Sequence, residues 1–584
     1  MANITDEQQT STITTAREAH LDAEGMHRGV GFLGLLWASE GSIIGSGWLF
    51  GALTAASVAG PSAIIAWCIG SAIIILLALV HAELGGLFPV SGGTSRFPHY
   101  AFGSLAGATF GWFAYIQAAT VAPIEVLAAI QYASTWHFAH SWYNGTTLHG
   151  AGIPVAIALM FVFTAVNLIG VRWLARVNNA LTWWKVIIPV GTIIVLLATS
   201  FHGSNFTAGG GFFVHGAAFK SIVLALPAGI VFSLLGFEQA VQLGGEARNP
   251  AKDLPRAVIL SILIGGAIYV LLQVAFIGAL EPRLLTDAHT WTDLATPGNS
   301  PALKALNAAP FYVVAKLAGL GLLAFLLRLD AIISPSGTGL IYLTSGSRIS
   351  FGLSKNGYIP EAFERTSIRH RVPVLSIIVT ALIGILFLLP FPSWAKLVGV
   401  VTSASVLMYA GAPLALGALR HQKPDLPRPY RLPYGNVLAP LAFVLATFIV
   451  YWAGWGTYST LLIVMLIGFA LISVSYIFGL NADRPPIDWS AALWVFPYLI
   501  GLGVISFFGQ FGASGTTEPS GILDGVGIFK NVLVGGKGQI PLYVDLAVLA
   551  AFSLVIYYTA MHYRLTERQV DHYVREVYPP PVAE

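Results

Sequence analysis

A carboxylate and four glycines interrupt an apolar stretch near the start of the chain, "WASEGSIIGSGWLFG", residues 37–51. Glycine weakens a helix, and inside a membrane a helix can break only where the freed backbone groups line a cavity or are buried in protein. The amides at the start of the second half-helix, beside its positive dipole end, can bind a carboxylate. The segment therefore predicts a broken helix around Gly45 and Gly47, one turn after Glu40.

A second interruption follows in "PAGIVFSLLGFEQA", residues 227–240, which again places glycines and an acid, Glu238, inside an apolar segment. Paired interruptions in corresponding spans of two halves indicate a transporter with an inverted repeat and a binding site near the middle of the membrane. The pair favours a functional site over packing alone.

Close helix packing is the alternative explanation for the first segment. Gly41 and Gly45, and again Gly47 and Gly51, have the GxxxG spacing of helix contacts in membranes. A dinucleotide-binding loop is excluded, because the glycines follow no predicted strand and are spaced GxGxxxG.

The composition predicts the elements that position these residues. Of 584 residues, 56% are hydrophobic and 10% are charged, whereas soluble domains average about 25% charged. Residues 63–80 form one of several long stretches without charge, each a candidate membrane span. The single cysteine, Cys68, excludes an intrachain disulfide and a cysteine-based zinc site, and the net charge of +3 gives no support for a nucleic-acid partner.

Windows of about twenty residues predict fourteen spans and an all-α integral membrane protein. The predicted spans are 30–59, 62–87, 103–138, 152–170, 180–201, 218–244, 255–281, 311–345, 372–392, 394–418, 436–456, 457–480, 489–511 and 541–562.

The basic residues predict that both termini are cytoplasmic. With the N-terminus inside, the outer segments hold only Arg283, Lys304, Lys396, Lys530 and Lys537, and most other Lys and Arg fall on inner segments. The expected domains are an N-terminal tail (1–29), a ten-helix core (30–418), helices 11 and 12 (436–480), two additional helices (489–562) and a C-terminal tail (563–584).

Four motifs in order carry a resemblance to a known family. They are "GSIIGSG" (41–47), "AELGGLFPVSGG" (82–93), "GGEARNPAKDLPRAV" (244–258) and "GSRISFGLSKNGYIPEAF" (346–363). Over roughly residues 30–480 the chain resembles permeases of the amino acid, polyamine and organocation (APC) superfamily. It departs from the usual pattern at Arg96, where many members have an aromatic residue, and in its two extra spans. Those spans and "LDAIISPSGTGL" (329–340) are similar to the bacterial aspartate:proton symporter branch.

The resemblance implies a LeuT-type fold of 5+5 inverted repeats, about 30–201 and 218–418, with broken first and sixth helices. The amides around the first break would hold a substrate carboxylate, and the carbonyls at the sixth break would hold its ammonium group. Phe232 is also the expected aromatic gate, with ordinary core packing as the alternative. The residues matched in this way are Ile43, Gly45, Ser46, Gly47, Phe232, Ser233, Leu235 and Gly236.

Lys185 is the one cation within the fifth predicted span. A buried lysine is costly as a cation unless it is partnered, so it can release a proton. In several proton-coupled relatives a lysine at the matching place takes the position where sodium-coupled relatives hold an ion. We therefore expect Lys185 to reach carbonyls of the first and eighth spans near Ile43 and Ser334. The alternative is a lysine that extends to the cytoplasmic surface, which is only some six residues, or about 9 Å, away.

Other ionisable residues inside predicted spans include four candidate site residues and Glu125, an acid following Pro123 for which the sequence indicates no specific role. Glu238 matches an acidic position in some relatives and is a candidate proton carrier or a ligand for a basic group, and Glu40 is a candidate for the same roles. Asp330 is a further candidate proton carrier. Arg328 is the candidate partner for the side-chain carboxylate of an acidic substrate, because its planar fork suits one. Arg328 and Asp330 can also pair, although an i, i+2 spacing points them to different faces of a regular helix.

Together these features predict a proton-coupled amino acid symporter in the bacterial inner membrane, with no cofactor and no bound metal, and aspartate or glutamate as the favoured substrate. The alternatives are a permease for neutral or many amino acids and a potassium importer on the same scaffold. An enzyme is not expected, because the chain has no HExxH, GxSxG or GxxxxGK[ST] motif. The oligomeric state is open.

Overall fold

The computed structural model describes residues 28–144, 147–169, 171–214, 218–296, 298, 300–367, 372–389, 392–511, 535–575 and 577, with the backbone alone for 171–180. Most of the predicted N-terminal tail, the end of the C-terminal tail and the predicted outer residue Lys530 lie outside these ranges.

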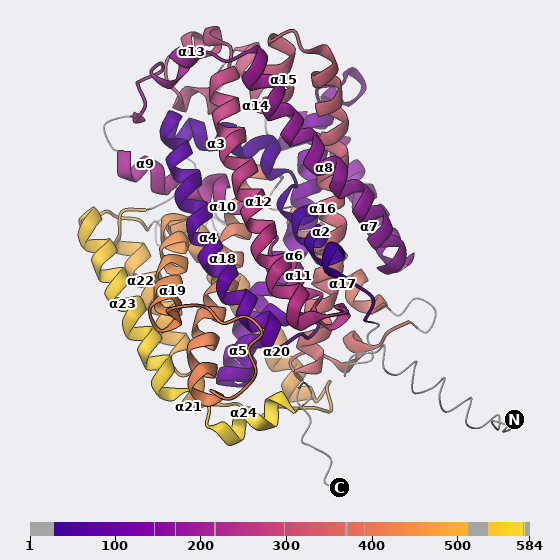
Figure 1. The fold of residues 1–584 in the computed structure, drawn as a ribbon, viewed down its shortest axis with the longest axis vertical. Helices are drawn as coiled ribbons and strands as arrows, with labels where there is room; N and C mark the ends of the chain where they lie inside the picture. The colour runs from indigo at the N-terminus through magenta and orange to yellow at the C-terminus, as the bar shows by residue number, and fades with distance from the viewer. Residues whose placement is uncertain are drawn as a thin grey trace, which may run out of the picture.

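The described chain is a bundle of helices (Figure 1). Eleven of the described helices are long and apolar enough to cross a membrane, and Ala218–Ser233 and Val374–Leu388 are shorter apolar helices. One of the eleven, Gly47–Leu87, contains parts of two predicted spans. The prediction of an all-α, multi-span membrane protein is confirmed.

The first half of the core begins with the two pieces of the broken first helix. Its helices are α2 (Phe32–Ile43), α3 (Gly47–Ala59), α4 (Ala63–Leu87), α5 (Gly93–Phe102), α6 (Ser104–Ala133), α7 (Gly152–Ile169) and α8 (Val171–Thr199). Strands β1 (Tyr143–Asn144) and β2 (Thr147–Leu148) form a small antiparallel hairpin.

The second half contains more short helices. They and the spans are α9 (Ala218–Ala225), the π-helical turn η5 (Leu226–Ile230), α10 (Val231–Ser233), α11 (Glu238–Gln242), α12 (Pro250–Ala279), α13 (Pro282–Ala288), α14 (Pro301–Ala308), α15 (Pro310–Leu317), α16 (Gly321–Lys355), α17 (Val374–Leu388) and α18 (Trp394–Gln422). The 3₁₀ turns are η1 (Gly60–Ser62), η2 (His137–Trp142), η3 (Gly203–Phe206), η6 (Gly244–Glu246), η7 (Thr292–Ala295) and η8 (Glu361–Glu364).

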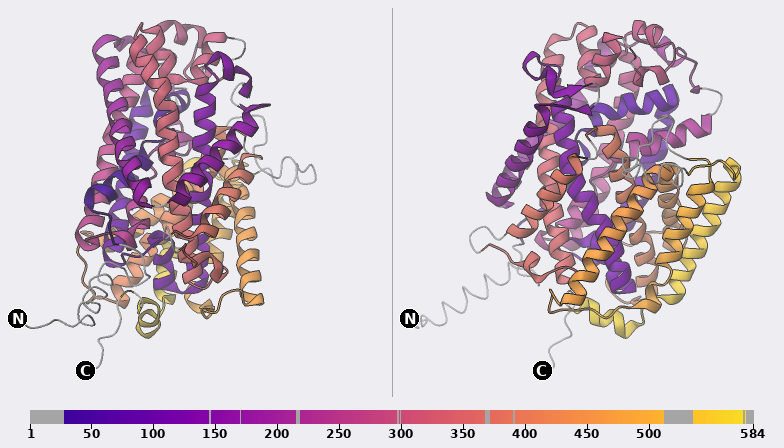
Figure 2. Two further views of the ribbon diagram at one scale, coloured as in Figure 1. Left: turned by 90° about the vertical axis from the view of Figure 1, so that its right-hand side faces the viewer. Right: turned by 180° about the vertical axis from the view of Figure 1, so that it is seen from behind.

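The C-terminal helices lie beside this core, with α22 and α23 on its outside (Figure 2). They are α19 (Gly435–Trp452), α20 (Gly454–Phe478), α21 (Trp489–Ala492), α22 (Val495–Phe508), α23 (Leu542–Tyr563) and α24 (Glu567–Val574).

The two predicted interruptions are real breaks that face each other. Helix α2 ends at Ile43 and α3 begins at Gly47, and Ile44 between them has non-helical angles (φ −89°, ψ 79°). The sixth helix stops at Ser233 and resumes at Glu238. Between them Gly236 has φ +133°, a conformation that favours glycine, and a Cβ there would lie 2.6 Å from the Ile43 nitrogen.

The sequence predicts the eighth span as one continuous segment, 311–345, and the structure differs from this. The structure has α15 and α16 there, separated at Gly319, where φ is +75°. Glycine permits this left-handed turn, which ends one helix before the next begins. The third span is also shorter than predicted, because α6 ends at Ala133.

Both ends of the described chain lie toward the same end of the bundle, the end opposite α13–α15 (Figure 1). The segment before α24 reaches α5, since the Leu565 amide donates to the Ala101 carbonyl at 3.3 Å. Val30, just before α2, pairs with Ala247, and Gly92 before α5 donates to the Gln242 carbonyl. This arrangement agrees with an even number of crossings.

Candidate functional site

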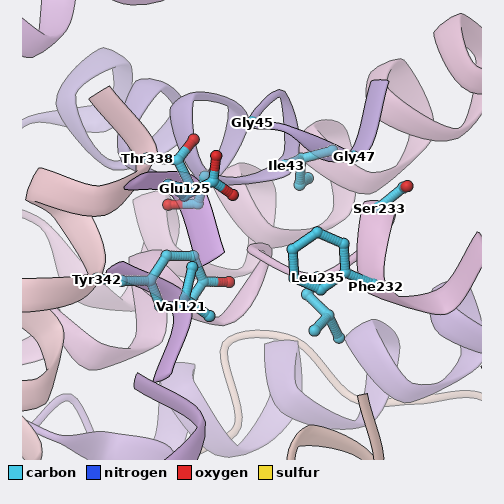
Figure 3. A pocket seen from close by; sticks show the side chains of 11 residues that line it. Ile43, Gly45, Gly47, Val121, Glu125, Phe232, Ser233, Leu235, Thr338 and Tyr342 are labelled. Carbon is cyan, nitrogen blue, oxygen red and sulfur yellow. The ribbon is translucent and has the colours of Figure 1, made fainter. Parts of the chain in front are cut away.

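A small cavity lies where the two breaks meet (Figure 3). Its volume is about 10 Å³, room for about one water molecule, so a whole amino acid can enter only if helices move. The lining residues are Ser42, Ile43, Gly45, Gly47, Val121, Glu125, Phe232, Ser233, Leu235, Thr338 and Tyr342.

Most of the residues predicted to bind substrate are brought together here. Six of them line the cavity, and Ser46 and Gly236 adjoin it along the two breaks. The six are Ile43, Gly45, Gly47, Phe232, Ser233 and Leu235.

A carboxylate from another helix occupies the amide end of the first break. Glu125, on α6, accepts a hydrogen bond from the Ser46 amide at 2.8 Å and one from the Ser46 hydroxyl at 3.0 Å. Its side chain is buried and lies beside Gly45 and Thr338 (Figure 3). The break therefore does present donors to an anionic group, and in this structure that group belongs to the protein.

Lys185, on α8, contacts this break at its other end, on the α2 side. Its ammonium group donates to the Gly41 carbonyl and, at 2.7 Å, to the Thr338 hydroxyl, which itself donates to the Gly41 carbonyl at 2.8 Å. The side chain is fully buried, so the alternative of a lysine extending to the surface does not apply here. The partner helices are those expected, the first and the eighth, but the partner atoms belong to Gly41 and Thr338 rather than to Ile43 and Ser334.

The Ile43 carbonyl is bound differently. It accepts a hydrogen bond from the hydroxyl of Tyr269, on α12, at 2.6 Å. This contact ties the end of α2 to the seventh span.

Glu238 lies on the side of the cavity toward α5 and has five donors. Its carboxylate accepts from two tyrosine hydroxyls, two glutamine side chains and one backbone amide. These donors are Tyr342, Tyr409, Gln117, Gln239 and the amide of Gly236.

Contacts between the two inner half-helices close this side of the cavity. The Ser39 hydroxyl on α2 donates to the Phe237 carbonyl at 3.0 Å and accepts from the Ala240 amide at 3.2 Å. Helices α2 and α11 must separate before the cavity can open toward α5.

The other two acids predicted to carry protons differ from each other. Asp330 accepts from the indole of Trp48 at 3.1 Å and from the hydroxyl of Ser334 at 2.6 Å, and so joins α16 to α3. Glu40 is fully buried, and neither of its carboxylate oxygens has a hydrogen-bond partner among the described residues.

Arg328, which is predicted to receive a substrate carboxylate, is bound to other groups in this structure. Its guanidinium donates to the Thr135 carbonyl at 2.9 Å and stacks over the Tyr312 ring at 4.2 Å. Arg328 does not line the cavity. Among the described residues Arg328 and Asp330 form no ion pair, in keeping with their i, i+2 spacing.

The sequence reasoning found no role for Glu125 and did not consider Thr338, Tyr342 or Tyr269. Glu125 carried a detectable signal, since it is an acid inside an apolar span and follows Pro123. The other three are ordinary polar residues of membrane helices, and only packing shows what they contact.

Comparison with known proteins agrees with this architecture. A profile of the amino acid permease family matches residues 30–472. The chain is 36% identical to the glutamate/serine transporter AimA of Bacillus subtilis, over 83% of this chain and 88% of the relative. It is 34% identical to the aspartate-proton symporter of the same organism, over 92% of this chain and 97% of the relative. The branched-chain amino acid permease BcaP is 25% identical over 76% of this chain and 92% of its own length. The chain therefore belongs to the amino acid permease family of the APC superfamily, whose members are membrane transport proteins and not enzymes.

Proposed function

We propose that this protein is a proton-coupled amino acid symporter that works by alternating access and takes up aspartate and glutamate. Two of its relatives are named for glutamate or aspartate, and one of these also for protons. The observation that carries the proposal is the placement of two buried ionisable groups at the first break, Lys185 on the Gly41 carbonyl before it and Glu125 on the Ser46 amide after it.

The substrate α-carboxylate binds at the Ser46 amide in this proposal. That amide is held by Glu125 in the closed structure, so the substrate has to displace the Glu125 carboxylate. Two carboxylates at the same binding site repel each other, and a proton on Glu125 removes the repulsion. Proton uptake and substrate binding are linked for this reason.

Lys185 supplies the second half of the coupling. As a cation it holds the first and eighth helices together through Gly41 and Thr338. When it loses its proton it keeps fewer donors for these acceptors, and the contact between α2 and α16 weakens. Glu40, buried without a partner, is a further candidate proton carrier, because an isolated buried carboxylate is costly as an anion.

A range that includes small neutral amino acids is the second candidate. The one charged side chain among the lining residues is the acid Glu125, so a basic partner for a substrate side-chain carboxylate is not found in the lining. The relative named for both glutamate and serine supports the same alternative.

Uptake into proteoliposomes with an acidic exterior tests the proposal. Labelled aspartate, glutamate and serine, and rubidium in parallel, should separate the alternatives. We expect accumulation of aspartate and glutamate that collapses when an ionophore removes the pH gradient. Accumulation of serine but not aspartate would replace the acidic substrate by a neutral one, and rubidium uptake without amino acid uptake would reject the amino acid site.

The orientation is part of the same proposal: both termini and α5 face the cytoplasm. Cysteine labelling from either side of the membrane, with single cysteines at Lys304 and Lys252 in a Cys68→Ser background, tests it. Labelling of position 304 from inside the cell would reverse the orientation.

A further inference from the structure

A tryptophan covers the cavity from the side toward α13–α15. Trp394 is the first residue of α18 and is 3% exposed. The other end of α18 contacts α5, where Gln422 donates to the Ala101 carbonyl. A helix of 29 residues is about 43 Å long, so Trp394 lies on the side of the cavity away from α5.

The indole ring joins three separate elements. It packs edge-on against Phe232 of the sixth helix, with centroids 5.7 Å apart and planes at 89°. It also packs against Phe50 of α3, with centroids 4.9 Å apart. Opening the cavity toward α13–α15 therefore requires Trp394 to part from at least one broken helix.

The indole nitrogen of Trp394 is connected to Glu125 through the side chain of Ser46. Trp394 Nε1 donates to the Ser46 hydroxyl oxygen at 2.8 Å, and that hydroxyl donates to Glu125 Oε1 at 3.0 Å. An indole N–H can only donate, so the direction of its hydrogen bond to Ser46 is fixed. An ionised Glu125 can only accept, so in that state the Ser46 proton points to it.

A proton on Glu125 weakens this chain of hydrogen bonds. A hydroxyl that donates to a carboxylate anion is polarised and accepts strongly from a third group, and it loses that polarisation when its acceptor is a neutral carboxyl. The Ser46 oxygen still has a lone pair for the indole N–H, so the contact with Trp394 becomes weaker but is not removed. Displacement of Glu125 by a substrate carboxylate restores an anionic acceptor beside Ser46.

We propose that Trp394 is a positioning residue. It links closure of the cavity on the α13–α15 side to the presence of an anionic carboxylate bound at Ser46. The hydrogen bond to Ser46 holds the cover closed when an anionic acceptor, either Glu125 or a substrate carboxylate, sits on Ser46. A protonated Glu125 with no substrate weakens this hydrogen bond and so favours opening. This inference rests on the proposed proton-coupled function.

Trp394→Phe tests the link because it keeps an aromatic ring against Phe50 and Phe232 and removes only the donor. The assay compares proton-driven accumulation with counterflow exchange at equal pH on both sides, each measured from pH 5 to 8. We expect proton-driven accumulation to fall roughly 3- to 10-fold, the worth of about one buried hydrogen bond, and its pH profile to flatten. Exchange should stay within about twofold, which also shows that the variant is folded.

Trp494→Phe is the matched control. Trp494 is also buried and its indole donates to the Ala491 carbonyl at 3.0 Å, within the C-terminal helices and away from the cavity. It should leave both activities and the pH profile unchanged. Ser46→Ala removes the acceptor, so Trp394→Phe should add less than about twofold in that background.

The outcomes separate this inference from the function on which it rests. A wild-type protein without proton-driven uptake contradicts the proposed function, and the inference falls with it. A coupled wild-type protein combined with an unchanged pH profile in Trp394→Phe, or a full additional loss in the Ser46→Ala background, overturns the role of Trp394 alone.

Discussion

The two broken helices each hold a carboxylate on a backbone amide, but they hold it in different ways. At the first break the Ser46 amide binds Glu125 at 2.8 Å, and at the sixth the Gly236 amide binds Glu238 at 2.9 Å. Glu125 comes from a different span, and it accepts from two groups of one residue, the Ser46 amide and the Ser46 hydroxyl. Glu238 belongs to the break itself and is held by five donors from α6, α16, α18 and its own segment.

This difference indicates which of the two carboxylates can be displaced from its backbone amide. Displacing Glu125 costs two hydrogen bonds, and a substrate carboxylate can replace both. Displacing Glu238 would leave two buried tyrosine hydroxyls, two glutamine side chains and a backbone amide without this acceptor, which is costly. We infer that the first break exchanges anions during transport and that Glu238 fixes the geometry of the sixth.

Among the variants that test this comparison, Lys185→Ala should have the largest effect on proton-driven accumulation. The change removes the cation that holds Gly41 and Thr338, so pH-driven accumulation should be lost, down to what the substrate gradient alone supports, while substrate binding stays measurable. Accumulation and ligand-induced thermal stabilisation in the purified protein measure the two effects. Lys316→Ala, an exposed lysine on α15, is the matched control. Unchanged proton-driven accumulation in Lys185→Ala would end the proposed role.

Glu125→Gln should remove the pH dependence of uptake while keeping a side chain of the same shape beside Ser46. We expect proton-driven accumulation to fall by about tenfold or more, because one buried charge that changes its protonation during transport is gone. Exchange at equal pH on both sides should persist.

Glu238→Gln is the internal comparison for Glu125→Gln. It should retain pH-dependent uptake and instead lower stability by about 1–3 kcal/mol, since an amide cannot accept from all five donors. A thermal unfolding curve in detergent measures this. If Glu238→Gln abolished the pH dependence and Glu125→Gln did not, the roles of the two breaks would have to be exchanged.

Gly47→Ala tests whether the breaks must touch. A Cβ at Gly47 would lie 2.6 Å from the Ser233 hydroxyl oxygen and 2.8 Å from its Cα, so the two breaks would be forced apart. We expect a loss of about 1–3 kcal/mol in stability, together with weaker substrate binding. Gly191→Ala, inside α8 with open space around its Cβ position, should be neutral or slightly stabilising. Normal binding by Gly47→Ala would show that the contact between the breaks is dispensable.

Arg328→Ala should have the smallest effect on selectivity. The guanidinium binds the Thr135 carbonyl and the Tyr312 ring outside the cavity, so the preference for aspartate over serine should change by less than about twofold. Competition assays with both amino acids measure it. A selective loss of aspartate would support the prediction made from the sequence, in which Arg328 receives the acidic side chain.

The sequence predicted the architecture well because its signals are local. Glycines and acids inside apolar spans marked both breaks, and the order of apolar segments marked the helices. The split at Gly319 was missed because α15 and α16 are both apolar on either side of one glycine, and hydropathy does not distinguish a left-handed turn from a continuing helix.

Side-chain partners were predicted less well, for a physical reason. The contact of Lys185 was assigned to the correct two helices and to atoms within one turn of the actual ones, because a shift of a few ångströms between helices changes which carbonyl is reached. Glu125 and Ser46 lie 79 positions apart, and nothing in either local segment predicts their hydrogen bond. Arg328 was interpreted from its chemistry alone, which does not give the direction in which its helix face points.

The most direct test of the central claim is to follow protons and substrate together. Proteoliposomes are loaded with a pH-sensitive dye and given labelled aspartate outside, with equal pH on both sides. Their interior should become acidic as the aspartate enters. The Glu125→Gln protein should then exchange aspartate with little acidification. Equal aspartate entry without acidification in the wild-type protein, or full acidification in Glu125→Gln, would contradict the account of the first break as a seat shared by substrate and a proton-carrying glutamate.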